Sequence, residues 1–422
     1  MHRGSGASRK QWGVDDLQSY LKPATEWELQ RTLLEASAAG TPIEIVGNGT
    51  KRAVGREMQT AALITTASLT GVRLYEPTEL VMSARAGTPL ARVESDLASC
   101  GQMLAFEPID MAPLVGGERG AASIGSVFAT NLSGSRRVLA GAARDHLLGI
   151  KAISGGGQSF HSGGRVMKNV TGYDLSRALC GSWGTLAVMT EVTFKVLPMP
   201  QETATLLLLN VDDAIAVEAL SQAMGSPYEV SGAVHIQMPL AMRLWHQGLA
   251  GERQSVTALR IENFSTSVPY RVERLTSELK AFGEVHVLDH ETSLSFWDEL
   301  RQLSILQGTD APLWRISTAP QAGPKVVAGI TRFMDCNAFY DWSGGLIWAE
   351  VLPTGDAGAS DIRRVIASVG GHATLMRAPP AVRAAVEVFQ PLEPGLAEIS
   401  RNLKSVFDPA GILNPGRMYA AF

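Results

Sequence analysis

Apolar residues recur at the spacing of a helix near the start of the chain, at Leu29, Leu33 and Ala36. Thr25 followed by Glu28 is a capping box, in which the two side chains bond free N–H groups of the first helical turn. Gly40 is placed to end the helix. The pattern predicts a helix from Thr25 onward and then a buried strand over residues 42–46.

A second strand and helix follow the same logic. Residues 80–86 predict a strand, and Thr88 is the expected N-cap of a helix with Pro89 at its first position. Further on, apolar and polar residues alternate over residues 192–197 and stop at Pro198, as is typical of a strand. We expect a first domain to end there, so that it covers residues 1–198.

Residues 199–395 change to an alternation of strands and helices with few glycines. The expected strands cover residues 203–209, 233–237, 256–262, 284–288, 313–318, 345–351 and 372–377. The expected helices cover residues 212–224, 269–282, 293–307, 324–334 and 359–368. This order predicts an α+β second domain, an antiparallel sheet with helices on one face.

Composition narrows the functional classes. The chain has 422 residues, a net charge of -4 and a pI near 6.1, with acidic and basic residues interspersed, which argues against a nucleic-acid-binding face or a polybasic membrane anchor. No apolar run approaches the ~20 residues that span a bilayer. The cysteines Cys100, Cys180 and Cys336 lie far apart and predict neither a metal site nor iron–sulfur ligands. We expect reduced thiols in a cytoplasmic protein.

Two glycine-rich stretches suit close approach to a large polar ligand. The strand over residues 42–46 runs into Gly-Asn-Gly-Thr-Lys at residues 47–51, and successive backbone N–H groups in such a turn can bind phosphate oxygens. Taken alone, this turn could equally be a plain hairpin turn. Residues 121–134 are rich in small residues, which leave the backbone accessible to a ligand. We expect that ligand to be a dinucleotide, because a dinucleotide needs N–H donors and small neighbouring side chains.

The order of four motifs resembles the FAD-binding domain of the vanillyl-alcohol oxidase superfamily, also called the PCMH type. The motifs are IVGNGTK, ARAGTPLARVESDLASCGQMLAFEP, GAASIGSVFATNLSG and KNVTGYDLSRALCGSWGTLAVMTEVTFKVLP. Within that superfamily, MKNVTGYDL and the tail FDPAGILNPGRMY are most similar to the FAD-binding E subunits of bacterial glycolate oxidases. The resemblance implies a two-part FAD-binding domain at residues 1–198, a substrate-side cap at 199–395, and a C-terminal segment, 396–422, that returns to the first domain.

The resemblance also assigns FAD contacts. The turn expected at the pyrophosphate comprises Gly47, Asn48, Gly49, Thr50 and Lys51. The segment expected along the adenosine and diphosphate contributes Ser123, Gly125, Ser126, Thr130, Asn131 and Gly134. Val192 matches a strand residue whose backbone holds the adenine, and the phrase expected near the flavin ring or the domain boundary comprises Lys168, Asn169, Gly172, Tyr173 and Asp174. Asn414 and Arg417 either contact the flavin or dock the tail.

The sequence of the cap identifies substrate-binding residues less clearly. Arg315 and Arg377 lie on expected cap strands and could hold a substrate carboxylate bidentately, although surface ion pairs explain them as well. Related 2-hydroxy acid dehydrogenases carry a metal-binding GHxGDGNxH motif, whereas residues 370–379 here read GGHATLMRAP. We therefore expect no metal. The pyrophosphate turn has neither His nor Cys, so we expect noncovalent FAD.

The resemblance implies the FAD-binding subunit of a glycolate oxidase complex. Such a subunit would oxidise glycolate or a similar 2-hydroxy acid by hydride transfer to flavin N5, and pass electrons to a homologous flavin subunit and an iron–sulfur subunit. Any membrane association would be peripheral, on the inner face of the cell membrane, through those partners. Two alternatives stay open, namely a self-sufficient FAD-dependent hydroxy-acid dehydrogenase and a noncatalytic structural subunit that keeps the flavin fold.

Overall fold

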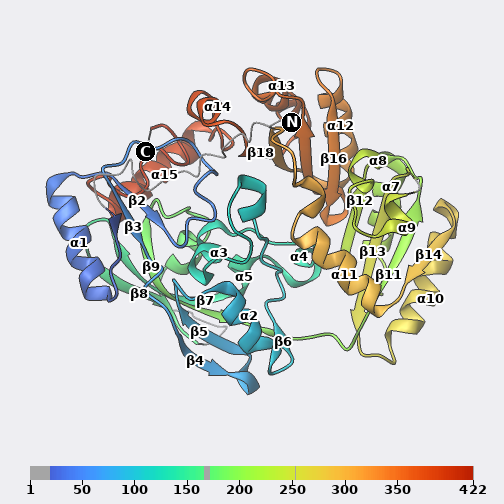
Figure 1. Ribbon diagram of the computed structural model, residues 1–422, viewed down its shortest axis with the longest axis horizontal. Helices are drawn as coiled ribbons and strands as arrows, with labels where there is room; N and C mark the ends of the chain where they lie inside the picture. Colours follow the sequence, from blue (N-terminus) through green and yellow to red (C-terminus); the bar gives the residue numbers. More distant parts are fainter. Residues whose placement is uncertain (1–19, 166–171, 252, 422) are drawn as a thin grey trace, which may run out of the picture.

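The computed structural model describes residues 20–165, 172–251 and 253–421. Figure 1 shows two small sheets in the first half of the chain, a large sheet in the second half, and a C-terminal segment that returns to the first half. The bounds expected for these three parts remain a prediction, and we use first domain, cap domain and tail as labels for them. Across the parts of the chain that the structure describes, every helix is too short or too polar to cross a membrane.

The first small sheet forms as the sequence predicts. Helix α1 (Glu26–Ala39) begins at Thr25, whose hydroxyl accepts a hydrogen bond from the Glu28 N–H at 3.1 Å. It ends at Gly40, whose φ of 62° is costly for residues with a Cβ. The predicted strand is β2 (Ile43–Val46), and it lies parallel to β3 (Ala62–Thr65), which also pairs with β1 (Tyr20–Leu21).

The second sheet is antiparallel, in the order β4-β5-β9-β7-β8. Its strands are β4 (Val72–Glu76), β5 (Val81–Arg85), β7 (Leu147–Ser154), β8 (Ser159–Gly163) and β9 (Ala187–Lys195). Its associated helices are α2 (Leu90–Ala98), α3 (Ile124–Thr130), α4 (Arg137–Ala140), α5 (Ala143–His146) and α6 (Leu175–Leu179). A short pair, β6 (Gln102–Met103) and β10 (Leu197–Pro198), lies beside this sheet.

One predicted cap is wrong by one residue. Helix α2 begins after Pro89, and Thr88 does not cap it. The Thr88 hydroxyl donates to the Arg85 carbonyl at 2.7 Å and accepts from the Gly71 N–H at 3.0 Å, so it closes the loop between β5 and α2 instead. A threonine hydroxyl that already bonds two backbone groups outside the helix is not available to cap the helix.

The cap domain holds an eight-stranded antiparallel sheet, which confirms the α+β prediction. Its strands are, in spatial order, β14 (Val285–Leu288), β11 (Glu202–Leu209), β13 (Val256–Asn263), β12 (Val230–Ile236), β16 (Cys336–Asp341), β17 (Leu346–Val351), β15 (Leu313–Ser317) and β18 (His372–Arg377). Strand β16 was not predicted from the sequence, because polar residues lie within its short apolar run and at its end. It joins the two halves of the sheet.

Most helices of the cap cover the outer face of this sheet, but the expectation that all of them lie on one face is wrong for one helix. Leu206 and Leu208 of β11 pack in one core with α7 (Asp213–Met224) and α10 (Val268–Leu279), and α12 (Gly323–Thr331) and α13 (Ala359–Val369) continue that layer. The alternate residue Leu207 belongs to another core, with α11 (His290–Arg301). Helix α11 therefore lies on the inner face, toward the first domain (Figure 1). Shorter helices are α8 (Met238–Ala241), α9 (Gln247–Ala250) and α14 (Pro380–Ala385).

The tail is fastened to the first domain. Helix α15 (Pro394–Phe407) ends at Phe407, which packs in the core of the five-stranded sheet. The Ile43 N–H of β2 donates to the Ile412 carbonyl at 2.8 Å, and the Asn414 N–H donates back to Ile43 at 2.9 Å. This pairing places the last residues beside the end of β2 (Figure 1).

Candidate FAD-binding site

A cavity opens at the end of β2. Residues from β2 and the turn after it, α3, the strand β9 and the tail line it: Ile45, Val46, Gly47, Asn48, Gly49, Thr50, Lys51, Arg52, Thr66, Ala86, Gly125, Ser126, Ala129, Thr130, Trp183, Gly184, Val188, Met189 and Arg417. Segments more than 350 residues apart in sequence thus share one wall.

The turn over residues 47–51 offers free donors to this cavity. The N–H groups of Asn48, Gly49, Thr50 and Lys51 donate no hydrogen bond to any other described residue. Gly49 has a φ of 75°, which allows the chain to turn tightly there. Four successive unbonded N–H groups form a concave anion site of the kind that holds phosphate oxygens.

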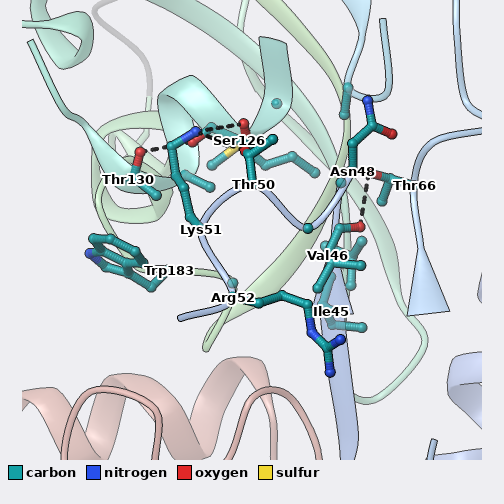
Figure 2. A pocket seen from close by; sticks show the side chains of 18 of the residues that line it. Ile45, Val46, Asn48, Thr50, Lys51, Arg52, Thr66, Ser126, Thr130 and Trp183 are labelled. Carbon is teal, nitrogen blue, oxygen red and sulfur yellow. Dashed lines mark hydrogen bonds between the residues drawn. The ribbon is translucent and has the colours of Figure 1, made fainter. Parts of the chain in front are cut away.

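The opposite wall comes from α3, where small residues are required. A Cβ added to Gly125 would lie 2.6 Å from the Ala86 Cβ, so only glycine lets this helix approach β5 so closely. Ser126 and Thr130 lie one turn apart on the cavity side, and the Ser126 hydroxyl accepts a hydrogen bond from the Lys51 Nζ at 3.2 Å. Figure 2 shows Lys51 reaching up to these hydroxyl groups while Arg52 points away.

Two buried cations, Lys51 and Arg417, face the cavity, and we call them the cavity cations. Lys51 is 6% exposed and Arg417 is 4% exposed, and neither forms an ion pair with a described carboxylate. Burial lowers the pKa of Lys51 to about 8, and burial likewise lowers the pKa of Arg417 to about 10. A buried positive charge without a counter-ion is costly, and a bound anion would offset that cost.

The two tail residues contact different parts of the molecule. Asn414 fastens it, because its side chain donates to the Trp183 carbonyl at 2.8 Å and accepts from the Ile45 N–H at 2.7 Å. Arg417 reaches the cavity, where it donates to the Lys51 carbonyl at 2.8 Å and lies 5.5 Å from the Trp183 ring. Neither Trp183 nor the β9 residues of the wall were predicted, because their small-residue turn and strand resemble ordinary core sequence.

Several predicted residues lie near the cavity without lining it. Ser123 is buried behind the turn, and a Cβ on Gly47 would collide with its hydroxyl oxygen. Asn131 accepts from the Arg144 N–H at 2.9 Å, and Gly134 lies at the domain boundary against Glu107. Val192 does not line the cavity, since it lies inside the sheet between β5 and β7. The β9 residues Val188 and Met189 line it instead.

The described residues of the phrase expected near the flavin ring do not line the cavity. Tyr173 is 92% exposed, and Gly172 and Asp174 are exposed as well. Asp174 caps α6 by accepting from the Arg177 N–H at 3.1 Å, which accounts for its carboxylate locally. Lys168 and Asn169 lie outside the described residues.

The two cap arginines differ in their surroundings. Arg377 donates to the carbonyls of Ala311 and Leu306 at 2.8 and 2.7 Å and lies 3.5 Å from Glu350, so its guanidinium is fully engaged within the cap. Arg315 makes no hydrogen bond or ion pair with a described residue, and its buried Nε has no partner. Arg315 is therefore the one of the pair that is free to bind a ligand.

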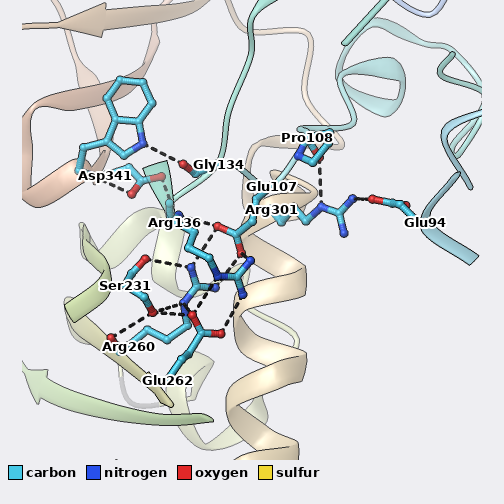
Figure 3. Close-up of polar contacts among 12 residues, drawn as sticks. Glu94, Glu107, Pro108, Gly134, Arg136, Ser231, Arg260, Glu262, Arg301 and Asp341 are labelled. Carbon is cyan, nitrogen blue, oxygen red and sulfur yellow. Dashed lines mark hydrogen bonds and ion pairs between the residues drawn. The ribbon is translucent and has the colours of Figure 1, made fainter. Parts of the chain in front are cut away.

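A cluster of balanced charges joins the two domains, and the sequence did not reveal it. We call Glu107, Arg136, Ser231, Arg260 and Glu262 the seam cluster (Figure 3). Arg260 donates to both oxygens of Glu107, at 2.8 and 3.0 Å, and Arg136 donates to both oxygens of Glu262, at 2.9 and 2.8 Å. The two guanidinium groups hold the pKa of Glu262 at about 2, well below its usual range, against the opposing effect of burial.

A second ion pair reaches across the domain boundary near the seam cluster. Arg301 of α11 bonds Glu94 of α2 and donates to the Pro108 carbonyl at 3.1 Å (Figure 3). These contacts hold the inner face of the cap sheet against the first domain. The arrangement positions cap residues over the region next to the cavity.

The cavity suits a dinucleotide, since it combines free N–H donors, small residues and buried cations. A family model described as an FAD-binding domain matches residues 17–163. The fold is similar to that of p-cresol methylhydroxylase, with a TM-score of 0.73 and 13% identity, covering 94% of this chain and 88% of that one. These findings define the class: a protein with an FAD-binding domain and the fold of p-cresol methylhydroxylase.

The chain is 34% identical over 403 residues to the glycolate oxidase subunit GlcE of Escherichia coli, a match that covers 94% of this chain and 99% of that protein. The chain belongs to the family of this GlcE subunit. It is also 24% identical over 321 residues to the glycolate oxidase subunit GlcD of Bacillus subtilis, which covers 71% of this chain and 68% of the other.

Proposed function

We propose that this chain is the FAD-binding subunit of a glycolate oxidase complex and oxidises glycolate, or a similar short 2-hydroxy acid, to the 2-oxo acid. The observation that carries the proposal is the pair of cavity cations, which have no carboxylate partner in a chain of the GlcE family. A pyrophosphate would bring the negative charge that this cavity lacks.

Bound FAD supplies the hydride acceptor for this reaction, the flavin N5. The chain's own residues bind and orient it. In the proposal, the N–H groups of residues 47–51, together with Lys51 and Arg417, hold the pyrophosphate. None of the described residues that line the cavity is His or Cys, which supports noncovalent binding.

The proposal includes two partners, a homologous flavin subunit and an iron–sulfur subunit. The relative GlcD is named as a subunit of the same kind of oxidase and is itself similar to this chain, which supports the first partner. The described cysteines Cys100, Cys180 and Cys336 lie on separate elements, so electrons that leave this flavin would need clusters held by another chain. The cytoplasmic location, with membrane contact only through partners, stays a prediction.

A noncatalytic structural role is the second candidate. It is favoured by residues 370–379, which lack most of the metal-binding motif seen in related 2-hydroxy acid dehydrogenases. In that case the flavin fold would serve to assemble the complex, and a partner would carry the substrate chemistry. A self-sufficient dehydrogenase is the third possibility, and it would reduce its own flavin without partners.

One experiment separates these candidates. The visible absorption spectrum of the purified chain is recorded without oxygen before and after addition of glycolate, and bleaching of the flavin band places the oxidation in this chain. The complete complex is then assembled with wild-type chain or with Lys51→Met, the variant designed to bind FAD more weakly, at an FAD concentration that leaves this variant empty. Loss of glycolate oxidation with Lys51→Met supports a working flavin, whereas full activity of that complex with the Lys51→Met chain free of FAD would show that this chain is structural.

A further inference from the structure

Trp342 lies at the domain boundary, and two guanidinium groups lie near its ring. It follows β16, and its indole Nε1 donates to the Gly134 carbonyl of the first domain at 3.0 Å, which holds the ring in place. The guanidinium carbon of Arg137, at the start of α4 in the first domain, lies 4.1 Å from the ring centroid. That of Arg315, on β15 of the cap, lies 5.1 Å from it. Each domain therefore contributes one arginine to the same aromatic ring.

Neither guanidinium is neutralised. Arg137 and Arg315 form no ion pair with any described carboxylate, whereas Arg136, the residue next to Arg137, is paired twice in the seam cluster. Burial lowers the pKa of Arg315 to about 10, and the charge of Arg137 lowers it further, so the two groups repel each other. Cation–π contacts orient the two arginines and do not cancel their charge.

The nearest acid does not supply the missing charge. Asp341 is buried at the end of β16, where its carboxylate accepts from the Ser135 hydroxyl at 2.8 Å and from the Trp342 N–H at 2.7 Å. Burial raises the pKa of Asp341 to about 7, so a large share of this group is protonated at neutral pH. It contributes only part of a negative charge, and its oxygens already have donors.

The other ionisable groups that act on the two arginines include one further acid, Asp145, which raises the pKa of Arg137 against the larger, lowering effect of burial, and two basic residues. His372 of β18 lies on the strand paired with β15, and its pKa is lowered by burial and then by the charges of Arg315, Arg137 and Arg363. Arg363 of α13 bonds backbone carbonyls, including that of Ala373, on the other side of the sheet. Arg137 lowers the pKa of Arg315 through its charge, and a small anion bound between the two guanidinium groups would offset this repulsion.

We infer that Arg137 and Arg315 together bind a small carboxylate anion at the boundary between the first domain and the cap, with Trp342 orienting both guanidinium groups. A guanidinium fork matches the two oxygens of a carboxylate. Trp348, the cross-strand neighbour of Arg315, is fully buried, and its ring centroid lies 6.0 Å from the Arg315 guanidinium carbon. The identification of this anion with the carboxylate of the 2-hydroxy acid rests on the proposed function.

The test measures binding without catalysis. Oxalate is titrated calorimetrically into the FAD-loaded full chain, because this dianion resembles a short 2-hydroxy acid but has no hydride to give. Arg315→Gln and Arg137→Gln should each weaken oxalate binding by roughly tenfold to a hundredfold, the cost of losing a hydrogen bond to a charged group. Arg315→Lys, which keeps the charge and loses the fork, should lie between Arg315→Gln and the wild type.

Arg364→Gln is the matched control. Arg364 lies on α13, on the outer face of the cap sheet, and its guanidinium pairs with Asp361 at 3.0 Å, so its loss should leave oxalate binding unchanged. The flavin spectrum and the thermal midpoint of each variant show whether it is folded. If Arg315→Gln does not fold, Arg315→Lys carries the comparison.

Two results would overturn the inference. One is wild-type chain that shows no oxalate binding, and the other is oxalate affinity that stays the same after substitution of either arginine. Failure of the proposed function is a different result: oxalate would bind through both arginines while glycolate leaves the flavin band unbleached in the chain and in the complex. That outcome would keep the anion site and remove glycolate as its substrate.

Discussion

The seam cluster and the cavity cations use the same kinds of residue in opposite ways. In the seam cluster two buried arginines meet two buried glutamates, and every charge has a partner from the other side of the boundary. In the cavity two equally buried cations have none. We infer different roles for the two sites. A balanced cluster of buried charges joins domains, whereas buried cations without a carboxylate partner suit the binding of a charged ligand.

The largest expected effect comes from unbalancing the seam cluster. Glu107→Gln would leave Arg260 and Arg136 to share one carboxylate, so we expect the free energy of unfolding to fall by about 3 to 5 kcal/mol. Urea denaturation followed by circular dichroism measures the loss. The control is Glu94→Gln, which removes a partly exposed ion pair at the same boundary and should cost less than about 1 kcal/mol. Equal losses in the two variants would refute the distinction.

The next effect is on cofactor binding. Lys51→Met should raise the dissociation constant for FAD by roughly tenfold to a hundredfold, because it removes a charged donor from the phosphate side of the cavity. It should not destabilise the FAD-free chain, since the lysine is buried there without a counter-ion. Flavin fluorescence titration and thermal unfolding of the FAD-free chain give the two values.

Lys404 is the matched control for that prediction. It is also a buried lysine, but its Nζ donates to Asp408, Thr185 and Leu413 at 2.7 to 2.8 Å. Lys404→Met should therefore destabilise the FAD-free chain by about 3 to 5 kcal/mol, because it leaves a buried carboxylate unpaired. If Lys51→Met destabilised the FAD-free chain as strongly, Lys51 would be a structural residue.

A smaller effect follows from the pKa of Lys51, which burial lowers from 10.5 to about 8. Below pH 8 the lysine is charged in the FAD-free chain and burying that charge costs stability, a cost that shrinks as the pH rises toward 10.5. FAD binding requires the charged form, so above pH 8 the affinity should fall by up to about tenfold per pH unit. Lys51→Arg should hold its affinity above pH 8, since a guanidinium stays charged. A wild-type affinity that is flat from pH 7 to 10 would contradict this assignment.

The smallest effect is expected at Tyr173. The resemblance places this residue near the flavin ring, but its side chain is almost fully exposed and does not line the cavity. Tyr173→Ala should change the FAD dissociation constant by less than about twofold, as is usual for a surface substitution. Trp183→Ala is the comparison, because Trp183 lines the cavity and lies against Arg417. A large loss of FAD affinity in Tyr173→Ala would instead support the contact with the flavin ring that the resemblance implies.

Local features were predictable where neighbours in sequence carry them. The capping box of α1 and its glycine end appear as expected, and so does the strand that runs into the turn at residues 47–51. The prediction failed at Thr88, where a distant loop supplied competing hydrogen bonds, and at β16, whose short apolar run lacks a clear pattern. Both misses are features that depend on partners elsewhere in the chain.

The sequence by itself determined the elements, the α+β class and, through several ordered motifs, the FAD-binding fold, because helix caps, strand patterns and glycine turns are properties of nearby residues. Only the tertiary structure decided which charged residues are paired. Arg136 and Arg137 are neighbours in sequence, yet one joins a neutral cluster and the other lies near the Trp342 ring, as Arg315 does. Pairing depends on what distant segments bring within a few ångströms, and the charges left unpaired are those for which we propose ligands.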